Sequence, residues 1–325
     1  MRKNPVLITM FIILILMPIL MLFSCTSRIS EDLGSERVSV LDNSSYEGLL
    51  SVHFLGLHTL GTKNGDASLV ITPGGKTLLI DAGNESNHAK LRTYLENAGI
   101  ETLDYVIFSH FHGDHVGDFQ KLAADFSIGK VLMLDFPEIQ GGSANERAGI
   151  LEVLYKKAIP YAYLGAGDVL QLDDEIELFC LSPDLPVKYD ETVVDDRTRT
   201  VFENQYSMVF QLKYREQVFL FTGDIYRDME YDLVSRYGSQ LRSDVLKVPH
   251  HGLHTSSSIS FLLEVQPSLS IIMSGEPTES TLTSLRNRNR TLTTVAYGTI
   301  MVMSDGTTLQ VITEHEDTTR GIYSE

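Results

Sequence analysis

The chain alternates between short apolar runs and segments with helical spacing. "ASLVITPGGKTLLIDAG" reads as two strands around a turn at residues 73–75, and "NHAKLRTYLENAGI" places four apolar residues at helical spacing before Gly99. "TLDYVIFSH" is typical of a buried strand, and "VGDFQKLAADF" is typical of a helix. This alternation of strands and helices predicts an α/β domain.

The alternation continues through the second half. "KVLMLDF" predicts a strand, and "SANERAGILEVLYKKA" predicts a helix that begins with a candidate capping box of Ser143 and Glu146. "VLQL" and "EIELFCL" form one expected pair of strands, and "SMVFQLKY" and "QVFLFTGD" form another. "DMEYDLVSRYG" follows as a helix, then "DVLKVPHHG" as a strand that ends in two histidines, and "GTIMVMS" and "TLQVIT" close the chain. Because a strand ending in histidines occurs in both halves, we expect two similar halves with the chemistry between them.

The N-terminus has a different pattern. A short basic start precedes residues 6–23, which contain no charge, and Cys25 follows directly after Ser24. This order resembles a bacterial lipoprotein signal, which implies that residues 1–25 form the signal segment and that Cys25 carries the lipid. An uncleaved membrane anchor is the alternative, since eighteen apolar residues are about the minimum span. Both hypotheses place the protein outside the cytoplasm and tethered to a membrane. Residues 26–46 read as a polar linker, and residues 47–325 as the folded domain.

Composition narrows the class of protein. A hydrophobic fraction of 43% and a charged fraction of 21% over 325 residues are those of a globular protein. The formal net charge of −17 disfavours unspecific binding to a nucleic-acid backbone, although a metal ion could supply the cation at a local site. If Cys25 is lipidated, Cys180 has no possible disulfide partner, and we expect it to be a small core residue. No protein partner is indicated.

The stretch "SHFHGDHVGD" carries the candidate chemistry. His110 and His112 follow a strand two residues apart, so both imidazoles point to one side. Asp114 and His115 come next, where the chain turns into a helix, and we expect Gly113 to permit that tight turn. These side chains can surround two metal positions, and their donor atoms suit Zn²⁺, Mn²⁺ or Fe.

"HFHGDH" resembles the HxHxDH signature of the metallo-β-lactamase superfamily, and other motifs of that family are present from about Val52 to Thr313. The resemblance implies a four-layer αβ/βα sandwich and a hydrolase with two divalent metal ions, zinc or alternatively manganese. It also implies that Asp81 in "LLIDAG" orients a ligand from beneath the metals and that Asp224 in "FTGD" bridges them. The pair His250 and His251 in "LKVPHHG" stands at the family's last histidine.

Three longer stretches are similar to the extracellular metallo-hydrolase domain of ComEC-type competence proteins: "GDASLVITPGGKTLLIDAG", "NQYSMVFQLKYREQVFLFTGDI" and "DVLKVPHHGLHTSSS". Teichoic acid phosphorylcholine esterases are similar around the same motifs. The resemblance implies hydrolysis of a phosphodiester-containing substrate, in nucleic acid or in an envelope polymer, by water activated on the metals. It also implies that Asp66 is a structural buttress.

The sequence departs from the wider family at one position. Many members carry a further histidine before the bridging aspartate, but there is none between Val116 and Thr222. One metal site would then hold His110, His112 and Asp224, completed by water or by Asn204. The other would hold Asp114, His115, Asp224 and one of the paired histidines. We favour His251 as the ligand, with His250 handling protons or holding a phosphate oxygen; Asp114 is the other candidate for proton transfer.

Several alternatives stay open. Hydrolysis of a lactone or a β-lactam is a second enzymatic hypothesis, and a membrane-tethered metal-binding protein without turnover is a third. The family's serine after "HHG" is Leu253 here, and Ser256 or Ser257 could replace it. The arginines of "LRNRNRT", Arg286, Arg288 and Arg290, could gather phosphates or line a solvated edge.

Overall fold

The computed structural model describes residues 28–30, 48–58, 65–137, 143–188, 193–273 and 277–315. The expected signal segment with Cys25, and most of the expected linker, lie outside these residues. Among the described residues, none of the helices is long and apolar enough to span a bilayer. Three residues of the expected linker are described, and they form the short strand β1.

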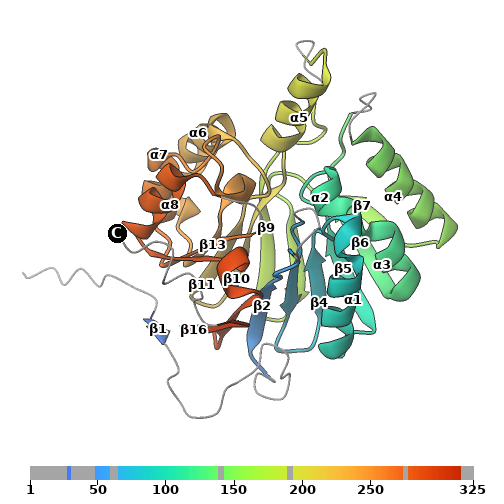
Figure 1. The fold of residues 1–325 in the computed structure, drawn as a ribbon, viewed down its shortest axis with the longest axis horizontal. Helices are drawn as coiled ribbons and strands as arrows, with labels where there is room; N and C mark the ends of the chain where they lie inside the picture. Colours follow the sequence, from blue (N-terminus) through green and yellow to red (C-terminus); the bar gives the residue numbers. More distant parts are fainter. Residues whose placement is uncertain are drawn as a thin grey trace, which may run out of the picture.

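Two sheets make up the centre of the described part of the chain (Figure 1). The first sheet has the order β1 (Arg28–Ser30), β16 (Thr308–Thr313), β15 (Ile300–Ser304), β2 (Leu50–Phe54), β3 (Ser68–Ile71), β4 (Thr77–Ile80), β5 (Thr102–Ile107), β6 (Ser127–Met133), β7 (Tyr161–Tyr163). The second has the order β14 (Arg290–Thr293), β13 (Leu269–Ile272), β12 (Val245–Lys247), β11 (Gln217–Phe221), β10 (Val209–Tyr214), β9 (Ile176–Ser182), β8 (Val169–Asp173).

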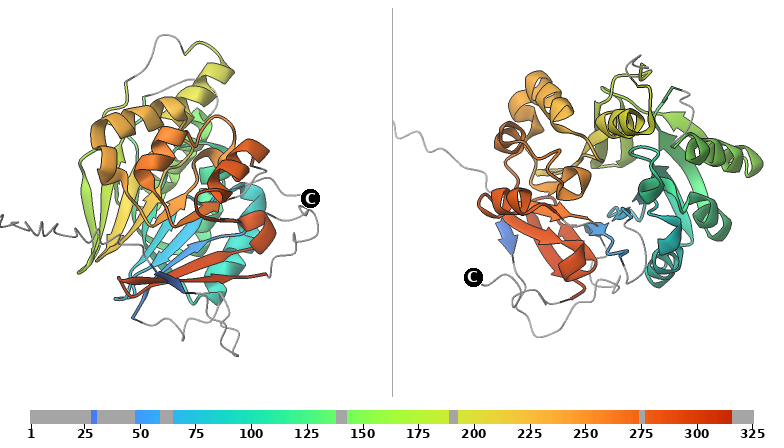
Figure 2. Two further views of the ribbon diagram at one scale, coloured as in Figure 1. Left: turned by 90° about the vertical axis from the view of Figure 1, so that its left-hand side faces the viewer. Right: turned by 45° about the horizontal axis from the view of Figure 1, so that its top comes forward.

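Helices cover the outer face of each sheet. On the first sheet these are α1 (His88–Asn97), α3 (Phe119–Asp125) and α4 (Ala144–Lys156). On the second they are α6 (Arg227–Tyr237), α7 (Ile259–Val265) and α8 (Glu279–Arg286). Figure 2 shows the same order of layers from two further directions. The described residues also form the α-helices α2 (Gly113–Val116), α5 (Asp196–Gln205) and α9 (Thr294–Tyr297). Short 3-10 helices span Glu85–Asn87, Gly238–Leu241 and Pro249–Gly252. The expected four-layer αβ/βα sandwich is confirmed.

Apolar side chains from both sheets form the core between them. Phe54 of the first sheet stacks on Phe221 of the second with ring centroids 5.9 Å apart, and Phe221 stacks on Phe210 at 5.1 Å. All three side chains are buried in the largest hydrophobic cluster. Burying such rings removes a large apolar area from water, which holds the two halves together.

The strand pairs expected from the sequence are confirmed. β3 pairs with β4, β8 with β9, and β10 with β11, all antiparallel. The capping box expected at Ser143 is wrong, because the Ser143 side chain makes no capping hydrogen bond. A reciprocal cap forms instead between Asp195 and Thr198 at the start of α5, a helix that the apolar pattern did not predict.

The parallel strands decide where a site can form. β4 and β5 run parallel in the first sheet, as do β11 and β12 in the second. The carboxyl ends of neighbouring parallel strands meet at one edge of a sheet, where ligand sites of α/β folds are found. The residues that follow these four strands are those that carry the expected metal ligands.

Candidate metal centre

Side chains from both halves converge at the carboxyl ends of β4, β5, β11 and β12. The ligand atoms of His110, His115 and Asp224 lie within 4.8 Å of one another, and so do those of Asp114, His115 and His251. A third such group joins Asp224 and His251 to Asp66. The structure therefore brings together six of the expected site residues, Asp224 among them.

The loop after β5 presents its ligands through ordinary backbone conformations. His112 is extended, with φ −66° and ψ 147°, and caps α2, which carries Asp114 and His115. The Nε2 atom of His110 lies 3.1 Å from the Nδ1 atom of His112, so both rings point to one side. The expectation that Gly113 permits a tight turn is wrong. Gly113 is the first residue of α2 and has no left-handed φ, so another residue could adopt its conformation.

Asp81 lies beneath this loop. Its Oδ2 atom is 2.8 Å from His115 Nδ1 and accepts a hydrogen bond from the Ser109 hydroxyl at 2.8 Å. Its Oδ1 atom accepts from the Ser109 amide, also at 2.8 Å. These are the contacts of a carboxylate that fixes the orientation and tautomer of a histidine. Sequence reasoning did not single out Ser109.

The distances between ligand atoms fit a metal ion. Tetrahedral ligands at Zn–N distances of about 2.0–2.1 Å lie roughly 3.3 Å apart. His115 Nε2 is 3.4 Å from Asp224 Oδ2, and His251 Nε2 is 3.2 Å from the same oxygen. His251 Nε2 is also 3.4 Å from Asp114 Oδ2. His115 Nε2 and Asp224 Oδ1 are buried without a hydrogen-bond partner, which divalent ions would satisfy.

Left-handed backbone separates the two adjacent histidines after β12. His250 has φ 48°, His251 has φ 51°, and Gly252 follows with φ 74°. His251 turns into the cluster, where its Nδ1 atom lies 3.2 Å from the Met273 carbonyl oxygen. A non-glycine residue in this region is uncommon, and two in succession mark a strained segment.

His250 lies beside the cluster. Its ring stacks on Tyr226 at 4.9 Å, its Nδ1 atom lies 2.6 Å from the Thr255 hydroxyl, and its Nε2 atom lies 3.4 Å from Asn204 Nδ2. Burial lowers the pKa of His250. The hydroxyl beside this histidine belongs to Thr255. Of the two serines suggested as replacements for the family's serine, Ser256 donates to the carbonyl oxygen of Pro249, and the Ser257 hydroxyl is buried without a hydrogen-bond partner.

Lys247 is a buried residue that sequence reasoning missed. Its Nζ atom lies 2.7 Å from Asp66 Oδ2 and 3.5 Å from Asp224 Oδ1, and it donates to the carbonyl of Gly223 at 3.1 Å. Burial alone would lower the pKa of the amine, but the carboxylates of Asp66 and Asp224 outweigh burial and raise it. The signal was available in "DVLKVP", because a lysine within a buried apolar run needs a charged partner.

Burial and opposite charges also act on the ligands. Burial would lower the pKa of His115, but the carboxylates of Asp224, Asp81 and Asp114 raise it well above its ordinary value. Burial would raise the pKa of Asp224, but His251, His115 and Lys247 hold it well below its ordinary value. The centre is therefore a dense set of opposite charges, into which divalent cations fit in place of protons.

Glu203 is another residue that sequence reasoning missed. It lies in α5 and is only 3% exposed, and its Oε2 atom is 2.8 Å from His112 Nε2. The next residue, Asn204, was one of two candidates, with water, to complete the site that holds His110 and His112. Its Nδ2 atom lies against Tyr226 and His250, and its Oδ1 atom is buried without a hydrogen-bond partner, so its role as a ligand stays a prediction.

The arginines of "LRNRNRT" are distant from this centre. Arg290 begins β14, and the register of the parallel strands pairs it with Leu269 and, through Leu269, with Val245. These residues lie at the start of their strands, whereas the histidines follow the end of β12. The hypothesis that these arginines gather phosphates at the metal centre is therefore wrong: Arg286 and Arg288 lie on an exposed edge, and Arg290 is half-buried.

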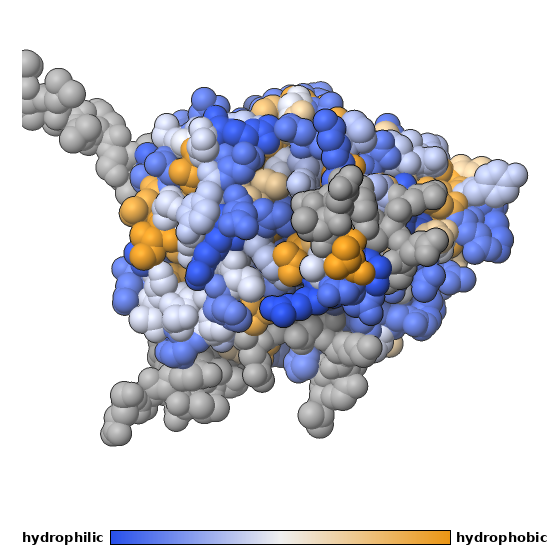
Figure 3. All heavy atoms as spheres, turned by 90° about the horizontal axis from the view of Figure 1, so that it is seen from above, coloured by the Kyte–Doolittle hydropathy of each residue, from blue (hydrophilic) through white to orange (hydrophobic). Residues whose placement is uncertain are grey.

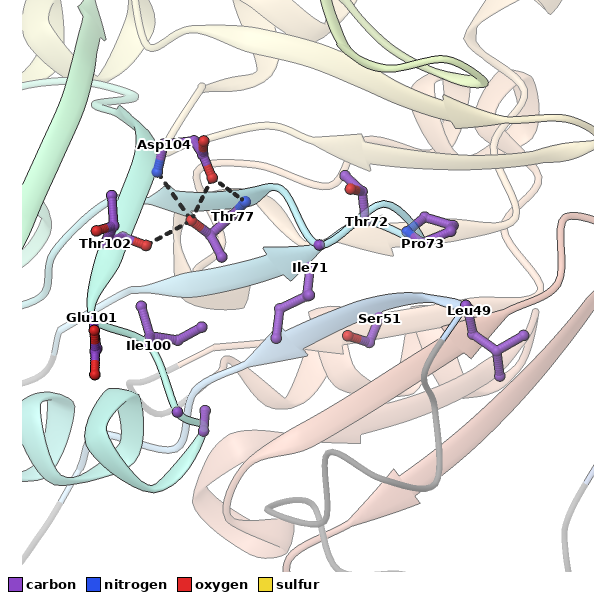
Figure 4. Close-up of a pocket in the computed structure, with 14 residues that line it drawn as sticks. Leu49, Ser51, Ile71, Thr72, Pro73, Thr77, Ile100, Glu101, Thr102 and Asp104 are labelled. Carbon is purple, nitrogen blue, oxygen red and sulfur yellow. Dashed lines mark hydrogen bonds between the residues drawn. The ribbon is translucent and has the colours of Figure 1, made fainter.

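A groove of about 670 Å³ also lies at the edge away from the histidines (Figure 4). Its lining includes Pro73 of the β3–β4 turn, Thr77 and Asp104. The Asp104 carboxylate is already bound by the Lys76 amine at 2.7 Å and the Thr77 amide at 3.0 Å. Among the described residues, the candidate metal ligands do not extend into this groove.

The two-sheet sandwich, with histidines and carboxylates at the ends of its parallel strands, defines a metal-dependent hydrolase fold. A family model described as the metallo-beta-lactamase superfamily matches residues 61–275, and the chain belongs to that family.

Two curated relatives show which members of the family the chain resembles. The chain is 26% identical over 216 residues to "ComE operon protein 3" of Bacillus subtilis, covering 64% of this chain and 25% of that protein. It is 27% identical over 229 residues to "Competence protein ComA" of Neisseria gonorrhoeae, covering 67% of this chain and 28% of that protein. The chain thus spans about a quarter of the length of these relatives, and the expected ComEC-like resemblance is confirmed.

Solved structures include fold neighbours. One is Igni18, a metallo hydrolase from Ignicoccus hospitalis, with 16% identity, a TM-score of 0.47 and coverage of 77% of this chain and 98% of that one. Another is a diphosphatase of the PhnP family, with 13% identity, a TM-score of 0.41 and coverage of 74% and 94%.

Proposed function

We propose that this protein is a membrane-tethered, extracytoplasmic phosphodiesterase that uses two divalent metal ions. The observation that carries the proposal is the divergence of the paired histidines, with His251 inside the ligand cluster and His250 beside it. This arrangement provides a ligand and a separate proton-handling group from one short motif. The same motif supports the resemblance to ComEC-type domains.

We assign Asp114, His115 and His251 to one metal ion and His110 and His112 to the other, with Asp224 shared. The ligand atom of His115 lies within 4.8 Å of those of Asp114 and His251, and also of those of His110 and Asp224. His112 is assigned through its contact with His110. Two bound divalent ions, zinc or alternatively manganese, would supply an activated water and positive charge for the phosphoryl oxygens. The protein itself would hold these ligand atoms at fixed distances from one another.

Asp114 and His250 are the groups proposed for proton transfer. Asp114 is the most accessible carboxylate of the cluster, with 34% of its side chain exposed, so it can exchange a proton with the attacking water. Burial lowers the pKa of His250, which favours the neutral form of its ring. Thr255 and Asn204 hold the ring on either side, so that it can serve the leaving oxygen or bind a phosphoryl oxygen.

The surface toward this end of the molecule supports a polar substrate. Figure 3 shows the face seen from above Figure 1, the end where α5 lies, and most of the described residues on it are hydrophilic. With a net charge of −17, the protein would contact a polyanion chiefly where the metal ions supply positive charge. Nucleic acid and a phosphate-bearing envelope polymer are the two substrate types to compare.

The test uses the purified full chain in detergent. Metal content is measured first, and the chain is then assayed on bis(p-nitrophenyl) phosphate, single-stranded DNA, a chromogenic lactone and nitrocefin. We expect metal-dependent hydrolysis of phosphodiesters that a chelator abolishes and added metal restores. A fully metallated protein that cleaves the lactone or nitrocefin and leaves every phosphodiester intact would overturn the proposed substrate class. Loss of fatty-acid labelling in Cys25→Ala, with labelling of the parent chain, tests the lipid anchor.

A further inference from the structure

Helix α5 places two consecutive side chains against the two histidine loops. Glu203 lies against His112 of the first loop, and Asn204 lies against His250 of the second. Figure 1 shows α5 above the strand ends, between the helices of the two halves. The helix therefore links two parts of the site that are far apart in the sequence.

Each candidate ligand histidine has a partner on the ring nitrogen that points away from the cluster. Ser109 Oγ lies 3.0 Å from His110 Nδ1, and Asp81 Oδ2 lies 2.8 Å from His115 Nδ1. The carbonyl oxygen of Met273 lies 3.2 Å from His251 Nδ1. Such partners fix the tautomer and the direction of a metal-binding imidazole.

His112 follows the same rule through Glu203. Its Nδ1 atom faces His110 Nε2 at 3.1 Å, and its Nε2 atom faces Glu203 Oε2 at 2.8 Å. A carboxylate at that distance favours the proton on Nε2, which leaves the lone pair of Nδ1 directed at the cluster. Glu203 is nearly fully buried, and burying a carboxylate is unfavourable unless a specific partner compensates.

We propose that Glu203 is the positioning residue of His112 and allows the side of the centre with His110 and His112 to retain a metal ion without a third histidine. The inference rests on the metal centre of the proposed function. It adds a residue, supplied by α5, that compensates for the ligand missing between Val116 and Thr222. Glu203 does not touch the substrate; it acts through His112.

The helix does not depend on Glu203 for its own position. Phe202 packs on Tyr206 with ring centroids 4.8 Å apart and on Phe136 at 5.4 Å. Asp195 and Thr198 cap its first turn. The conservative variant Glu203→Gln is therefore expected to fold, and near-ultraviolet circular dichroism of the metal-free chain checks this.

The experiment measures metal affinity in the full chain. Wild type, Glu203→Gln and the control Glu216→Gln are loaded with zinc and titrated with a chelator, and ¹¹³Cd-loaded samples are compared by NMR. Glu216 is exposed in the β10–β11 turn, away from the histidines. We expect Glu203→Gln to lower the affinity for one of two zinc ions by about 10–100-fold, the usual effect of removing such a partner. The affinity for the other ion should not change, and Glu216→Gln should bind both ions as the wild type does.

A double-mutant cycle separates positioning from general structural support. If Glu203 acts through His112, then Glu203→Gln causes no further loss of metal affinity in a His112→Ala background. A loss that persists in that background, or unchanged release of both ions in Glu203→Gln, overturns the inference while the metal centre stands. A wild-type chain that retains no metal overturns the proposed function and this inference together.

Discussion

The two histidine loops reach the same centre by different means. The loop after β5 uses an extended stretch followed by α2, so the two-residue spacing of His110 and His112 is enough to align them. The loop after β12 uses two left-handed residues, which send the adjacent His250 and His251 to different surroundings. In the first loop, the spacing of the histidines in the sequence is enough to predict the direction of their side chains. In the second loop, that direction depends on a left-handed backbone conformation that the sequence "HHG" does not reveal.

The loops also differ in how their ligands are held. Asp81 Oδ2 lies 2.8 Å from His115 Nδ1, whereas His251 Nδ1 faces the backbone carbonyl of Met273 at 3.2 Å and, at 3.4 Å, the carboxylate of Asp66. A substitution can remove the nearest partner of His115, but it cannot remove the backbone partner of His251. The orientation of the ligand histidine in the first loop should therefore be more sensitive to substitution of a neighbouring side chain. In the second loop it should be more sensitive to changes in the backbone conformation of the loop itself.

The largest effect is expected where both loops meet. Asp224→Ala removes the carboxylate that lies near His115 and His251, so both ions should bind more weakly and hydrolysis of bis(p-nitrophenyl) phosphate should fall below detection. Metal content and turnover are measured together. Asp228→Ala, at an exposed position in α6, is the control and should retain both. Activity near wild type in Asp224→Ala would show that the loops do not share this ligand.

The second loop is tested by its two histidines. His251→Ala should lose metal, because its ring lies in the ligand cluster. His250→Ala should keep its metal and lose about 10²–10⁴-fold in turnover, the usual size of a general acid–base contribution. Metal analysis and kcat are compared for the pair. The reversed pattern, with metal lost in His250→Ala alone, would contradict the roles assigned here.

The first loop is tested through its carboxylate. Asp81→Asn should weaken metal binding by about 10–100-fold, because the His115 ring loses its charged partner. Chelator competition measures the affinity. Unchanged affinity would mean that packing alone orients His115. The first loop would then not depend on a side-chain carboxylate to orient its ligand, and the contrast with the second loop would be lost.

The smallest effect compares one glycine from each loop. A Cβ at Gly252 would lie 2.9 Å from Pro277 Cβ, and its φ of 74° disfavours side chains. Gly252→Ala should therefore lower the free energy of unfolding by about 1–3 kcal/mol. A Cβ at Gly113 would meet only Glu146 Oε1, at 3.7 Å. Gly113→Ala should therefore change the free energy of unfolding by less than about 1 kcal/mol. Chemical denaturation of the metal-free chains gives both values, and equal losses would refute the contrast.

Much of the fold was predictable because its strands and helices have regular apolar patterns. The pairing of β3 with β4 and of β10 with β11 follows from short turns between apolar runs. Helix α5 has no such pattern, because Phe202, packed on Phe136 and Tyr206, is its chief apolar anchor. Without the helix, Glu203 could not be placed near His112, and the spacing of the motifs carried no information about it.

The candidate site was predictable where one motif supplied several ligands. His110, Asp114 and His115 come from one stretch, and their spacing predicted their proximity. The position of Lys247 beneath Asp224 depends on the pairing of β11 with β12, which no local pattern specifies. For the same reason the sequence left open which of the two adjacent histidines enters the cluster.

The return of β15 to the first sheet has a consequence for the order in which the protein can assemble. β2 pairs with β15, so that Phe54 lies opposite Ile300, and the sheet is incomplete until β15 has been synthesised. Contacts between such distant segments slow folding, and an unpaired strand edge exposed in the meantime favours aggregation. During synthesis the buried strand Leu50–Phe54 therefore keeps one edge unpaired until β15, which follows it by more than two hundred residues, has emerged.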